Sequence, residues 1–282
     1  LDRTSPIVAA RLCDGSRLCA VIPPVSPHGM CVSIRRFTQD ALALSQFADE
    51  PVTKLLVQLV RNRCNIVVSG KAGSGKTSLL NVLCSHMQPN ERIVTIEDVR
   101  ELAIALPNAV QLETRPTTPE GLAGVSMTDL VRTALRLRPD RIIVGEIREP
   151  RGASVMLQAA NTGHDGTMTT IHANTADRAL NFRMVGFART GAAMTAEVAT
   201  AEVSSAINLV VQVVRRAGRR YISEIAVVDP SCIKDGLIKP VTMFSAGLID
   251  GSPMFERVGY VPASTELGMK LDELGLLERW SQ

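Results

Sequence analysis

Residues 65–80, NIVVSGKAGSGKTSLL, decide how this chain folds. An apolar run at 66–68 leads into a glycine-rich segment at 70–77, and an apolar-periodic segment follows at 78–83. This is G-x-x-x-x-G-K-[ST] between a predicted strand and a predicted helix, the setting in which the motif forms a phosphate-binding loop. Glycines let successive backbone N–H groups face phosphate oxygens, and the positive end of the following helix points at the same anion.

The loop predicts a nucleotide site. A chance match to the motif would have no reason to lie between a predicted strand and a predicted helix. Lys76 would reach the β- and γ-phosphates, and the Thr77 hydroxyl would bind Mg²⁺ as the metal ligand. The predicted nucleotide-binding residues are Gly70, Ala72, Gly73, Ser74, Gly75, Lys76, Thr77 and Ser78.

Composition limits the number of domains and the classes of protein to which this chain can belong. With 282 residues, 45% of them hydrophobic, the chain can form one large or two modest domains with ample core. A net charge of +3 is too small to indicate nucleic-acid binding by itself. No apolar run approaches the length of a membrane span and no signal peptide is recognisable, so we expect no transmembrane segment. Because the chain opens on Leu1 and not on methionine, we expect a further piece upstream.

The cysteines are spread along the chain without a C-x-x-C pair, at positions 13, 19, 31, 64, 84 and 232. Their spacing fits neither a zinc ribbon nor a disulfide framework. We interpret them as small buried residues of a protein in a reducing cytosol.

The first 37 residues predict a small antiparallel unit, because short apolar-rich segments alternate with turn residues at 7–12, 18–22 and 30–36. Thr38 is a candidate cap for a short helix that extends through Gln46. Pro51 suits the first turn of a helix that reaches Arg63. We therefore predict a partial α+β N-terminal domain and linker at 1–48, a main domain at 49–230 and a C-terminal extension at 231–282.

From residue 65 strands and helices alternate, which predicts a doubly wound, mostly parallel α/β sheet with the phosphate loop after its first strand. The expected strands are 66–69, 92–97, 109–113, 141–146 and 166–172, and the expected helices are 77–87, 126–137, 151–161 and 175–187. A helix at 195–206 and an antiparallel hairpin of 209–214 and 221–228 follow. After 230 the chain reads as irregular until a helix at 264–277. Ligand chemistry should gather at the carboxyl ends of the strands.

Two of these strands end in acids. Glu146 closes the run DRIIVGE at 140–146, with Gly145 at the place where the usual pattern has Asp. A nucleotidase needs a carboxylate there to hold Mg²⁺ or polarise water. Glu97 begins EDVRE and is the candidate general base that orients the attacking water. Asp98 and Glu101 stay open as alternatives for this base. The competing interpretation is a solvated turn in which Asp98 caps a helix.

The segment GHDGTMTTIHAN at 163–174 puts polar residues on a strand that should be buried, which a purely structural strand would avoid. His172 at its end is the candidate to contact the γ-phosphate by a hydrogen bond, ahead of His164. A single histidine is more often structural, but two of the four histidines of the chain lie in this one segment.

Arginines form the last group of candidates, because phosphoryl transfer benefits from a guanidinium on the γ-phosphate, often from another domain or subunit. Position alone does not choose among them, and most surface arginines are only solvated. The candidates are Arg17 and Arg35 on the N-terminal strands, and Arg132, Arg136 and Arg138 before the Glu146 strand.

These segments, in this order and spacing, resemble the secretion and traffic ATPases of type II and type IV secretion systems and of type IV pili. The match comprises GKAGSGKT, TIEDVREL, RIIVGEIR and TGHDGTMTTIHAN and extends over about 7–229. The stretches DGSRLCAVIPP and VSIRRF are most similar to the Tad-pilus assembly ATPases of the CpaF type. Two departures are the missing four-cysteine zinc module of some members and an incomplete N-terminal domain.

The resemblance implies a RecA-like ATPase domain that uses ATP and Mg²⁺, within a homo-oligomeric ring, a hexamer, in which hydrolysis drives domain movement. It implies a cytoplasmic protein, peripherally associated with the inner face of the cytoplasmic membrane. Its partners would be the inner-membrane platform proteins of a pilus or secretion machine. The catalytic residues that it implies are Glu97, Glu146, His172, Arg35 and Arg17.

A RecA-like nucleic-acid-dependent ATPase is the competing hypothesis. It would need a basic channel with aromatic side chains, whereas aromatic residues make up only 3% of this chain. The only dense basic segment is RRAGRR at 215–220, which we interpret as a solvated hairpin, so we expect no nucleic-acid partner. A non-catalytic nucleotide module would not explain two acidic segments and a histidine segment.

Overall fold

The computed structural model describes residues 1–36, 42–117, 121–250, 252–273 and 275. The chain forms two compact units, Leu1–Ala41 and Leu42–Gln282. The smaller unit is a three-stranded antiparallel sheet, as predicted, with strands β1 (Ile7–Arg11), β2 (Arg17–Val21) and β3 (Cys31–Arg35). The start of the helix predicted at Thr38 lies outside the described residues, and Gln46 ends a short 3₁₀ turn, Leu44–Gln46.

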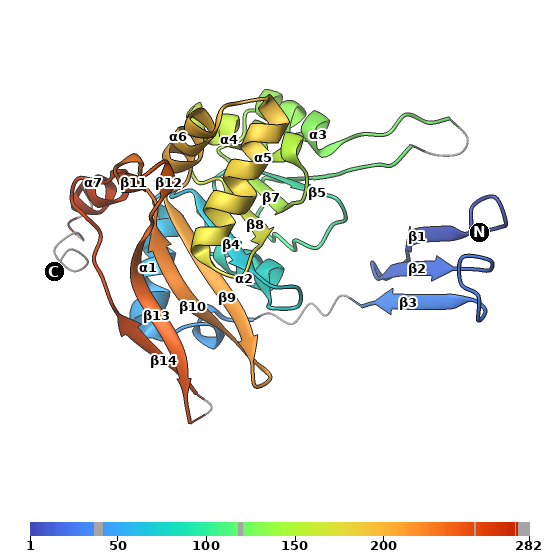
Figure 1. The fold of residues 1–282 in the computed structure, drawn as a ribbon, viewed down its shortest axis with the longest axis horizontal. Coiled ribbons are helices and arrows are strands. Elements are labelled where there is room, and N and C mark those ends of the chain that lie inside the picture. The colour runs from blue at the N-terminus through green and yellow to red at the C-terminus, as the bar shows by residue number, and fades with distance from the viewer. Residues whose placement is uncertain (37–41, 118–120, 251, 274, 276–282) are drawn as a thin grey trace. The chain divides into compact units, whose positions relative to one another are not determined.

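The larger unit is built on a nine-stranded sheet in the order β14-β13-β10-β9-β4-β8-β7-β5-β6 (Figure 1). Its parallel part consists of β4 (Ile66–Gly70), β5 (Ile93–Glu97), β6 (Ala109–Glu113), β7 (Arg141–Ile147), β8 (Met168–His172) and β9 (Leu209–Arg216). Strands β4 and β5 are buried along their whole length, as near-continuous apolar runs inside a parallel sheet should be. The predicted mostly parallel α/β sheet is confirmed.

Helices cover both faces of this sheet, as the doubly wound prediction requires (Figure 1). Successive strand residues point to opposite faces, so Val68 belongs to one core cluster and Val67 to the other. The Val68 face is covered by α1 (Glu50–Arg61) and α2 (Lys76–Cys84). The Val67 face is covered by α3 (Met127–Ala134), α4 (Pro150–Asn161), α5 (Val185–Ala192) and α6 (Ala196–Ala206).

The hairpin predicted after α6 is present, with longer strands than expected. Strand β10 (Arg219–Val227) pairs antiparallel with β9, and the two-residue turn between them is Ala217-Gly218. Both turn residues have positive φ, 48° and 77°, which suits the tight turn that joins two twisted strands. The arginines predicted as a loop therefore belong to the strand ends, where Arg215 pairs with Arg220.

The prediction of an irregular chain after 230 is wrong. Two short strands, β11 (Ile233–Lys234) and β12 (Leu237–Ile238), pair with each other, and β13 (Val241–Ile249) joins the large sheet beside β10. Strand β14 (Ser252–Arg257) is the sheet edge, where Pro253 is tolerated because an edge strand need not donate every N–H. Both strands are half-exposed along their outer parts, so the sequence shows no clear apolar alternation. The boundaries at 48 and 230 stay predictions.

Two helix predictions need correction. The helix expected at 175–187 is a π-helical segment, Arg178–Met184, that continues into α5 and ends only at Ala192. The C-terminal helix α7 is described over Glu266–Glu273 and begins two residues after the predicted start at 264, whereas residues 274, 276 and 277 of the predicted range lie outside the described residues. Within the described part of the chain, no helix is both long and apolar enough to cross a membrane.

The burial predicted for the cysteines holds for only half of them. Cys64, Cys84 and Cys232 are buried in the larger unit. The other three, Cys13, Cys19 and Cys31, are exposed. Cys19 and Cys31 lie on strands of the small sheet, which no second layer covers within the described part of that unit, and Cys13 lies in the turn between β1 and β2.

Candidate active site

The phosphate loop connects β4 to α2 at the carboxyl edge of the parallel sheet. Gly73 and Gly75 have φ of 71° and 99°, values that glycine adopts without strain, so the backbone can turn sharply here. Gly70 is needed for a different reason, because a Cβ at this position would overlap Ser74 Oγ and the carbonyl oxygen of Val213. The predicted nucleotide-binding residues at 70–75 therefore form one tight turn whose conformation depends on its glycines, and Lys76, Thr77 and Ser78 form the first turn of α2.

The start of α2 fits an anion. The helices α1, α3 and α6 are capped by side-chain oxygens of Asp49, Ser126 and Thr195, whereas Gly75 gives α2 no side-chain cap. The start of α2 therefore presents backbone N–H groups and the positive end of the helix dipole toward the space where phosphate oxygens can approach. Ser74 Oγ is buried and has no hydrogen-bond partner within the described residues. The uncapped start of α2 and the buried Ser74 hydroxyl therefore make this turn suited to hold a phosphate group.

Lys76, His172 and Glu146 form a connected row beside this turn. Parallel pairing places Gly70 of β4 opposite His172 of β8, so the histidine lies next to the loop. Lys76 Nζ lies 3.3 Å from His172 Nδ1, and His172 Nε2 lies 2.7 Å from Glu146 Oε1. The second contact is close but not aligned as a hydrogen bond, which leaves Glu146 Oε1 without a hydrogen-bond partner in the described structure.

The pKa of His172 is lowered, first by partial burial and then by the Lys76 ammonium, against the opposing effect of Glu146. A lowered pKa favours the neutral imidazole at pH 7, and a neutral ring can accept a hydrogen bond from Lys76 at Nδ1. His172 is therefore suited to respond to charge that arrives on the phosphate loop. His164 lies before the start of β8, at the opposite end of the strand, so only one histidine of the pair reaches this site.

Glu97 lies at the end of β5 and is only 3% exposed. Its Oε1 accepts hydrogen bonds from the backbone N–H groups of Glu101 and Leu102, at 2.8 and 3.0 Å. Its Oε2 is buried without a hydrogen-bond partner among the residues that the structure describes. Burial raises the pKa of Glu97 to about 7. A carboxylate with one unpaired buried oxygen and a pKa near neutrality is suited to accept a proton from water.

Gly145 explains the departure from the usual pattern at the end of β7. Strands β5 and β7 are neighbours, and a Cβ at Gly145 would lie 2.8 Å from Glu97 Cγ. An Asp here would push the Glu97 side chain aside. The acid of β7 therefore comes one residue later, at Glu146.

The structure separates the three acids that the sequence left open. Glu101 contributes its backbone N–H to Glu97, and Asp98 lies 3.7 Å from the Arg148 guanidinium. No helix begins at Asp98 in the described part of the chain, so its proposed role as a helix cap is wrong. Of the three, Glu97 alone is buried, and this burial suits a base because it raises the pKa of Glu97.

Arg148 was missed by the sequence reasoning. Its Nε donates a hydrogen bond to Glu146 Oε2 at 2.6 Å, and its Nη1 faces Asp98, so it joins the two acidic strand ends. The available signal was its position two residues after Glu146, since residues i and i+2 of an extended strand share a face.

The remaining candidate arginines lie elsewhere in the chain. Arg132, Arg136 and Arg138 are exposed and precede the amino end of β7, whereas Glu146 is near its carboxyl end. Arg17 and Arg35 lie directly opposite each other on β2 and β3 of the smaller unit. Their approach to the nucleotide site stays a prediction.

The sheet order, the uncapped phosphate loop and the acids at neighbouring strand ends define a RecA-like phosphate-loop fold. Residues 1–235 match the family described as type II/IV secretion system protein, and the chain belongs to that family. The family predicted from the sequence is thereby confirmed, whereas the closer likeness to the CpaF type stays a prediction.

Two curated relatives and one solved structure are similar to this chain. A putative conjugal transfer protein of Mycobacterium tuberculosis is 40% identical over 238 residues, which cover 82% of this chain and 65% of that protein. The type IV secretion system protein PtlH of Bordetella pertussis is 36% identical over 279 residues, which cover 83% of this chain and 77% of that protein. The VirB11 ATPase of the Brucella suis type IV secretion system, solved in complex with sulphate, gives a TM-score of 0.56 at 27% identity, covering 82% of this chain and 76% of that one. The chain thus spans 65% of the length of its mycobacterial relative.

Proposed function

We propose that this protein is the ATP-hydrolysing motor of a bacterial pilus-assembly or type II/IV secretion system. The observation that carries the proposal is Glu97: a buried carboxylate with an unpaired oxygen and a pKa of about 7, on the same sheet edge as the phosphate loop. Burying the carboxylate with Oε2 unpaired costs stability, so its placement favours catalysis. The family of the chain and its conjugal-transfer and type IV secretion relatives support the same conclusion.

In the proposed reaction the loop and Lys76 hold the phosphates of ATP, and Glu97 accepts a proton from the attacking water. The water oxygen forms a bond to the terminal phosphorus as the bond to the bridging oxygen of ADP breaks, which gives ADP and inorganic phosphate. Mg²⁺, bound through the Thr77 hydroxyl, would supply charge neutralisation. Glu146 would polarise the reacting groups, with Arg148 fixing its orientation, and His172 would sense the terminal phosphate.

We further propose a homo-oligomeric ring, a hexamer, at the cytoplasmic face of the inner membrane, with pilus or secretion platform proteins as its partners. Arg17 and Arg35 of the smaller unit would reach the phosphates and so couple hydrolysis to domain movement. A CpaF-type Tad-pilus motor is the kind of protein that we favour. The mass of the protein in solution, measured with and without a non-hydrolysable ATP analogue, tests ring formation, and a monomer in both states would contradict it.

Lys76→Ala tests the enzymatic part directly. Loss of the Lys76 ammonium, which contacts His172, should lower the rate of ATP hydrolysis by about 10²-fold or more, since one preorganised charged donor is worth this much in similar sites. Lys54→Ala, at an exposed position on α1, is the matched control and should keep the parental rate. A folded Lys76→Ala variant with the parental rate would refute the assignment.

A further inference from the structure

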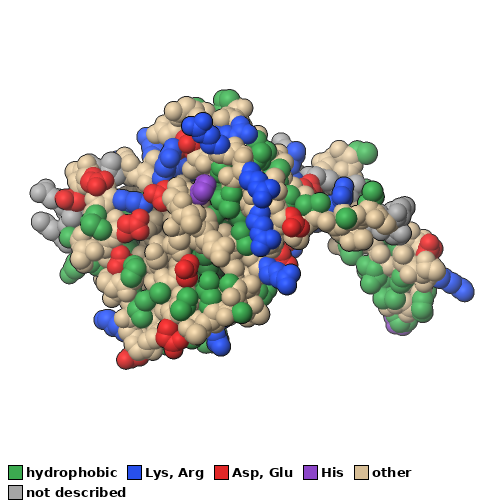
Figure 2. Space-filling model, turned by 90° about the horizontal axis from the view of Figure 1, so that it is seen from above, with side chains coloured by type: hydrophobic (Ala, Val, Ile, Leu, Met, Phe, Trp, Pro, Cys, Tyr) green, Lys and Arg blue, Asp and Glu red, His purple; other side chains and the backbone are tan. Residues whose placement is uncertain are grey.

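A cationic cavity opens on the His172 side of the phosphate loop. Its volume is about 400 Å³, and its lining includes Lys71, His172, Asn174, Arg178, Phe182 and Arg183. Three of these residues are permanent cations, and no acid is among the described residues that line the cavity. Figure 2 shows basic side chains gathered into a band on one face of the molecule.

Arg178 and Arg183 are held in place by aromatic rings. The Arg178 guanidinium lies 5.0 Å from the centre of the Phe182 ring, and that of Arg183 lies 4.7 Å from the centre of Phe187. Cation–π contacts of this length fix a guanidinium without using its N–H donors. The donors therefore stay available to a ligand.

The local backbone points to a ligand site as well. Both arginines belong to the π-helical segment Arg178–Met184, and such segments occur frequently at functional sites because the wider turn re-aims the side chains. Arg183 Nε is buried and has no hydrogen-bond partner within the described residues. Buried N–H donors are rarely left unpaired, so a merely solvated surface arginine does not account for Arg183.

We propose that this cavity binds a phosphate oxyanion, next to the phosphates held by the loop. The inference rests on the proposed ATP hydrolysis. Lys71 and Ala72 belong to both the loop and the cavity wall, and His172 contacts Lys76 while lining the cavity, so the two sites are continuous. Planar guanidinium groups match phosphate oxygens in pairs of parallel hydrogen bonds. The oxyanion has two sources, the terminal phosphate still attached to the nucleotide and the inorganic phosphate that hydrolysis releases.

The first experiment measures phosphate binding without turnover. With saturating ADP in the loop, inorganic phosphate should raise the melting temperature of the parent protein above that in chloride of equal ionic strength. Arg183→Gln should bind phosphate about tenfold more weakly, and Arg178→Gln combined with it about a hundredfold, since each removes a charge-assisted hydrogen bond. Arg183→Lys keeps the charge but not the paired geometry and should fall between parent and Arg183→Gln.

Arg189→Gln is the matched control, because Arg189 is an exposed arginine of α5 outside the cavity lining. It should bind phosphate as the parent does. A parent without a phosphate-specific shift, or a folded double variant with the parental shift, excludes released phosphate as the ligand, and it overturns the proposal if the double variant also keeps the parental affinity for a non-hydrolysable ATP analogue.

The second experiment separates the two sources. If the double variant loses affinity for a non-hydrolysable ATP analogue but not for ADP, the cavity holds the attached terminal phosphate. If it loses affinity for inorganic phosphate alone, the cavity holds the cleaved product. If neither affinity changes while the parent binds ADP and hydrolyses ATP, only this inference fails, whereas a parent that neither binds nucleotide nor hydrolyses ATP contradicts the proposed function itself.

Discussion

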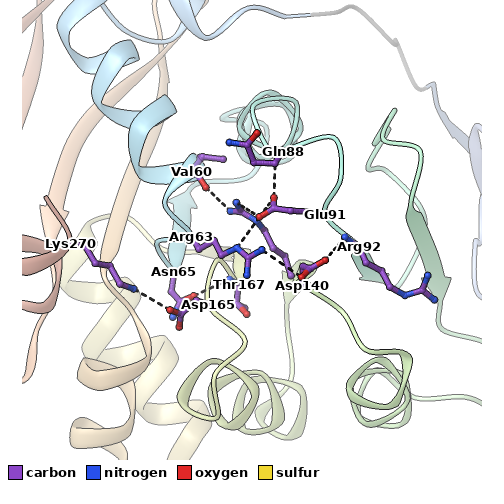
Figure 3. Close-up of polar contacts among 11 residues, drawn as sticks. Val60, Arg63, Asn65, Gln88, Glu91, Arg92, Asp140, Asp165, Thr167 and Lys270 are labelled. Carbon is purple, nitrogen blue, oxygen red and sulfur yellow. Dashed lines mark hydrogen bonds and ion pairs between the residues drawn. The ribbon is translucent and has the colours of Figure 1, made fainter. Parts of the chain in front are cut away.

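At the amino ends of β5 and β7, Arg141 and Glu91 form a buried ion pair (Figure 3). At the carboxyl ends of the same strands, Glu97 is buried without an ion-pair partner among the described residues. Arg141 is fully buried and donates two hydrogen bonds to Glu91, at 2.9 and 3.0 Å, and a third to the Val60 carbonyl at 2.6 Å. Arg63 adds a further contact of 2.9 Å to Glu91. Glu97 accepts only backbone N–H groups and leaves Oε2 without a partner in the described structure.

The difference separates a structural use of buried charge from a functional one. Removing an ion from water costs several kcal/mol, about as much as good pairing can return. At the amino end, pairing with Arg141 and Arg63 offsets this cost and joins α1 to the start of two strands. At the carboxyl end, burial raises the pKa of Glu97 to about 7, so the group is ready to exchange a proton. A mutation of Glu97 at the carboxyl end should therefore lower activity and not stability. A mutation of Glu91 at the amino end should lower stability and not activity.

Glu97→Gln should have the largest effect. Without a base, turnover should fall by about 10²–10⁴-fold, whereas ADP affinity should stay near the parental value. Its melting temperature at pH 8 should be equal to or above that of the parent, because an uncompensated buried charge is gone. Single-turnover hydrolysis, nucleotide titration and calorimetry check the three parts. Glu113→Gln, the same change at the register partner of Glu97 on β6, is the control. Equal losses of turnover in both variants would contradict a specific role of Glu97 as the base.

Glu91→Ala should show the reverse pattern. It leaves the Arg141 guanidinium buried without its carboxylate, so unfolding free energy should drop by about 3–5 kcal/mol. Turnover per folded molecule, measured well below the melting temperature, should stay near that of the parent. Denaturant unfolding measures this free energy. Glu50→Ala, which removes an exposed helical ion pair with Lys54, is the control and should leave stability close to that of the parent. A Glu91→Ala protein as stable as the parent would mean that the amino-end cluster is not structural.

Gly145→Ala tests the packing between the two acidic strand ends. Its Cβ would lie 2.8 Å from Glu97 Cγ, so we expect a loss of about 1–3 kcal/mol in stability together with at least a tenfold loss of turnover from the displaced base. Gly247→Ala in β13, where a Cβ would have nothing within 4 Å among the described atoms, is the matched control. Parental activity in Gly145→Ala would show that the position of Glu97 is not critical.

The pH dependence should give the smallest but most specific signal. Because the pKa of Glu97 is raised from 4.5 to about 7 by burial, the base form accumulates only as pH rises through 7, and the rate should rise with it. The folded protein binds this proton more tightly than the unfolded chain, so the contribution of Glu97 to stability is present below pH 4.5 and is lost as pH rises to about 7. Glu97→Gln should abolish both dependences. A rate profile that is flat between pH 6 and 8 would contradict the assignment.

The sequence could predict those features that depend on local pattern. The phosphate loop is recognisable from residues 65–80 alone. Glu97 and Glu146 each follow an apolar run, and His172 ends a segment with unexpected polar residues. The contact between Gly145 and Glu97 joins two neighbouring strands that are far apart in sequence, so no local pattern reveals it. The π-helical segment that presents Arg178 and Arg183 departs from the 3.6-residue period by which helices are recognised, and β13 and β14 lack alternation because both faces are partly exposed.

A crystal structure with Mg²⁺ and a non-hydrolysable ATP analogue tests the central claim most directly. We expect the phosphates in the loop beside Lys76. We also expect an ordered water about 2.6–3.2 Å from Glu97 Oε2, within reach of the terminal phosphorus. The Arg141–Glu91 pair should be unchanged. A nucleotide bound away from the loop, or a Glu97 carboxylate turned onto an arginine with no water beside it, would contradict the account.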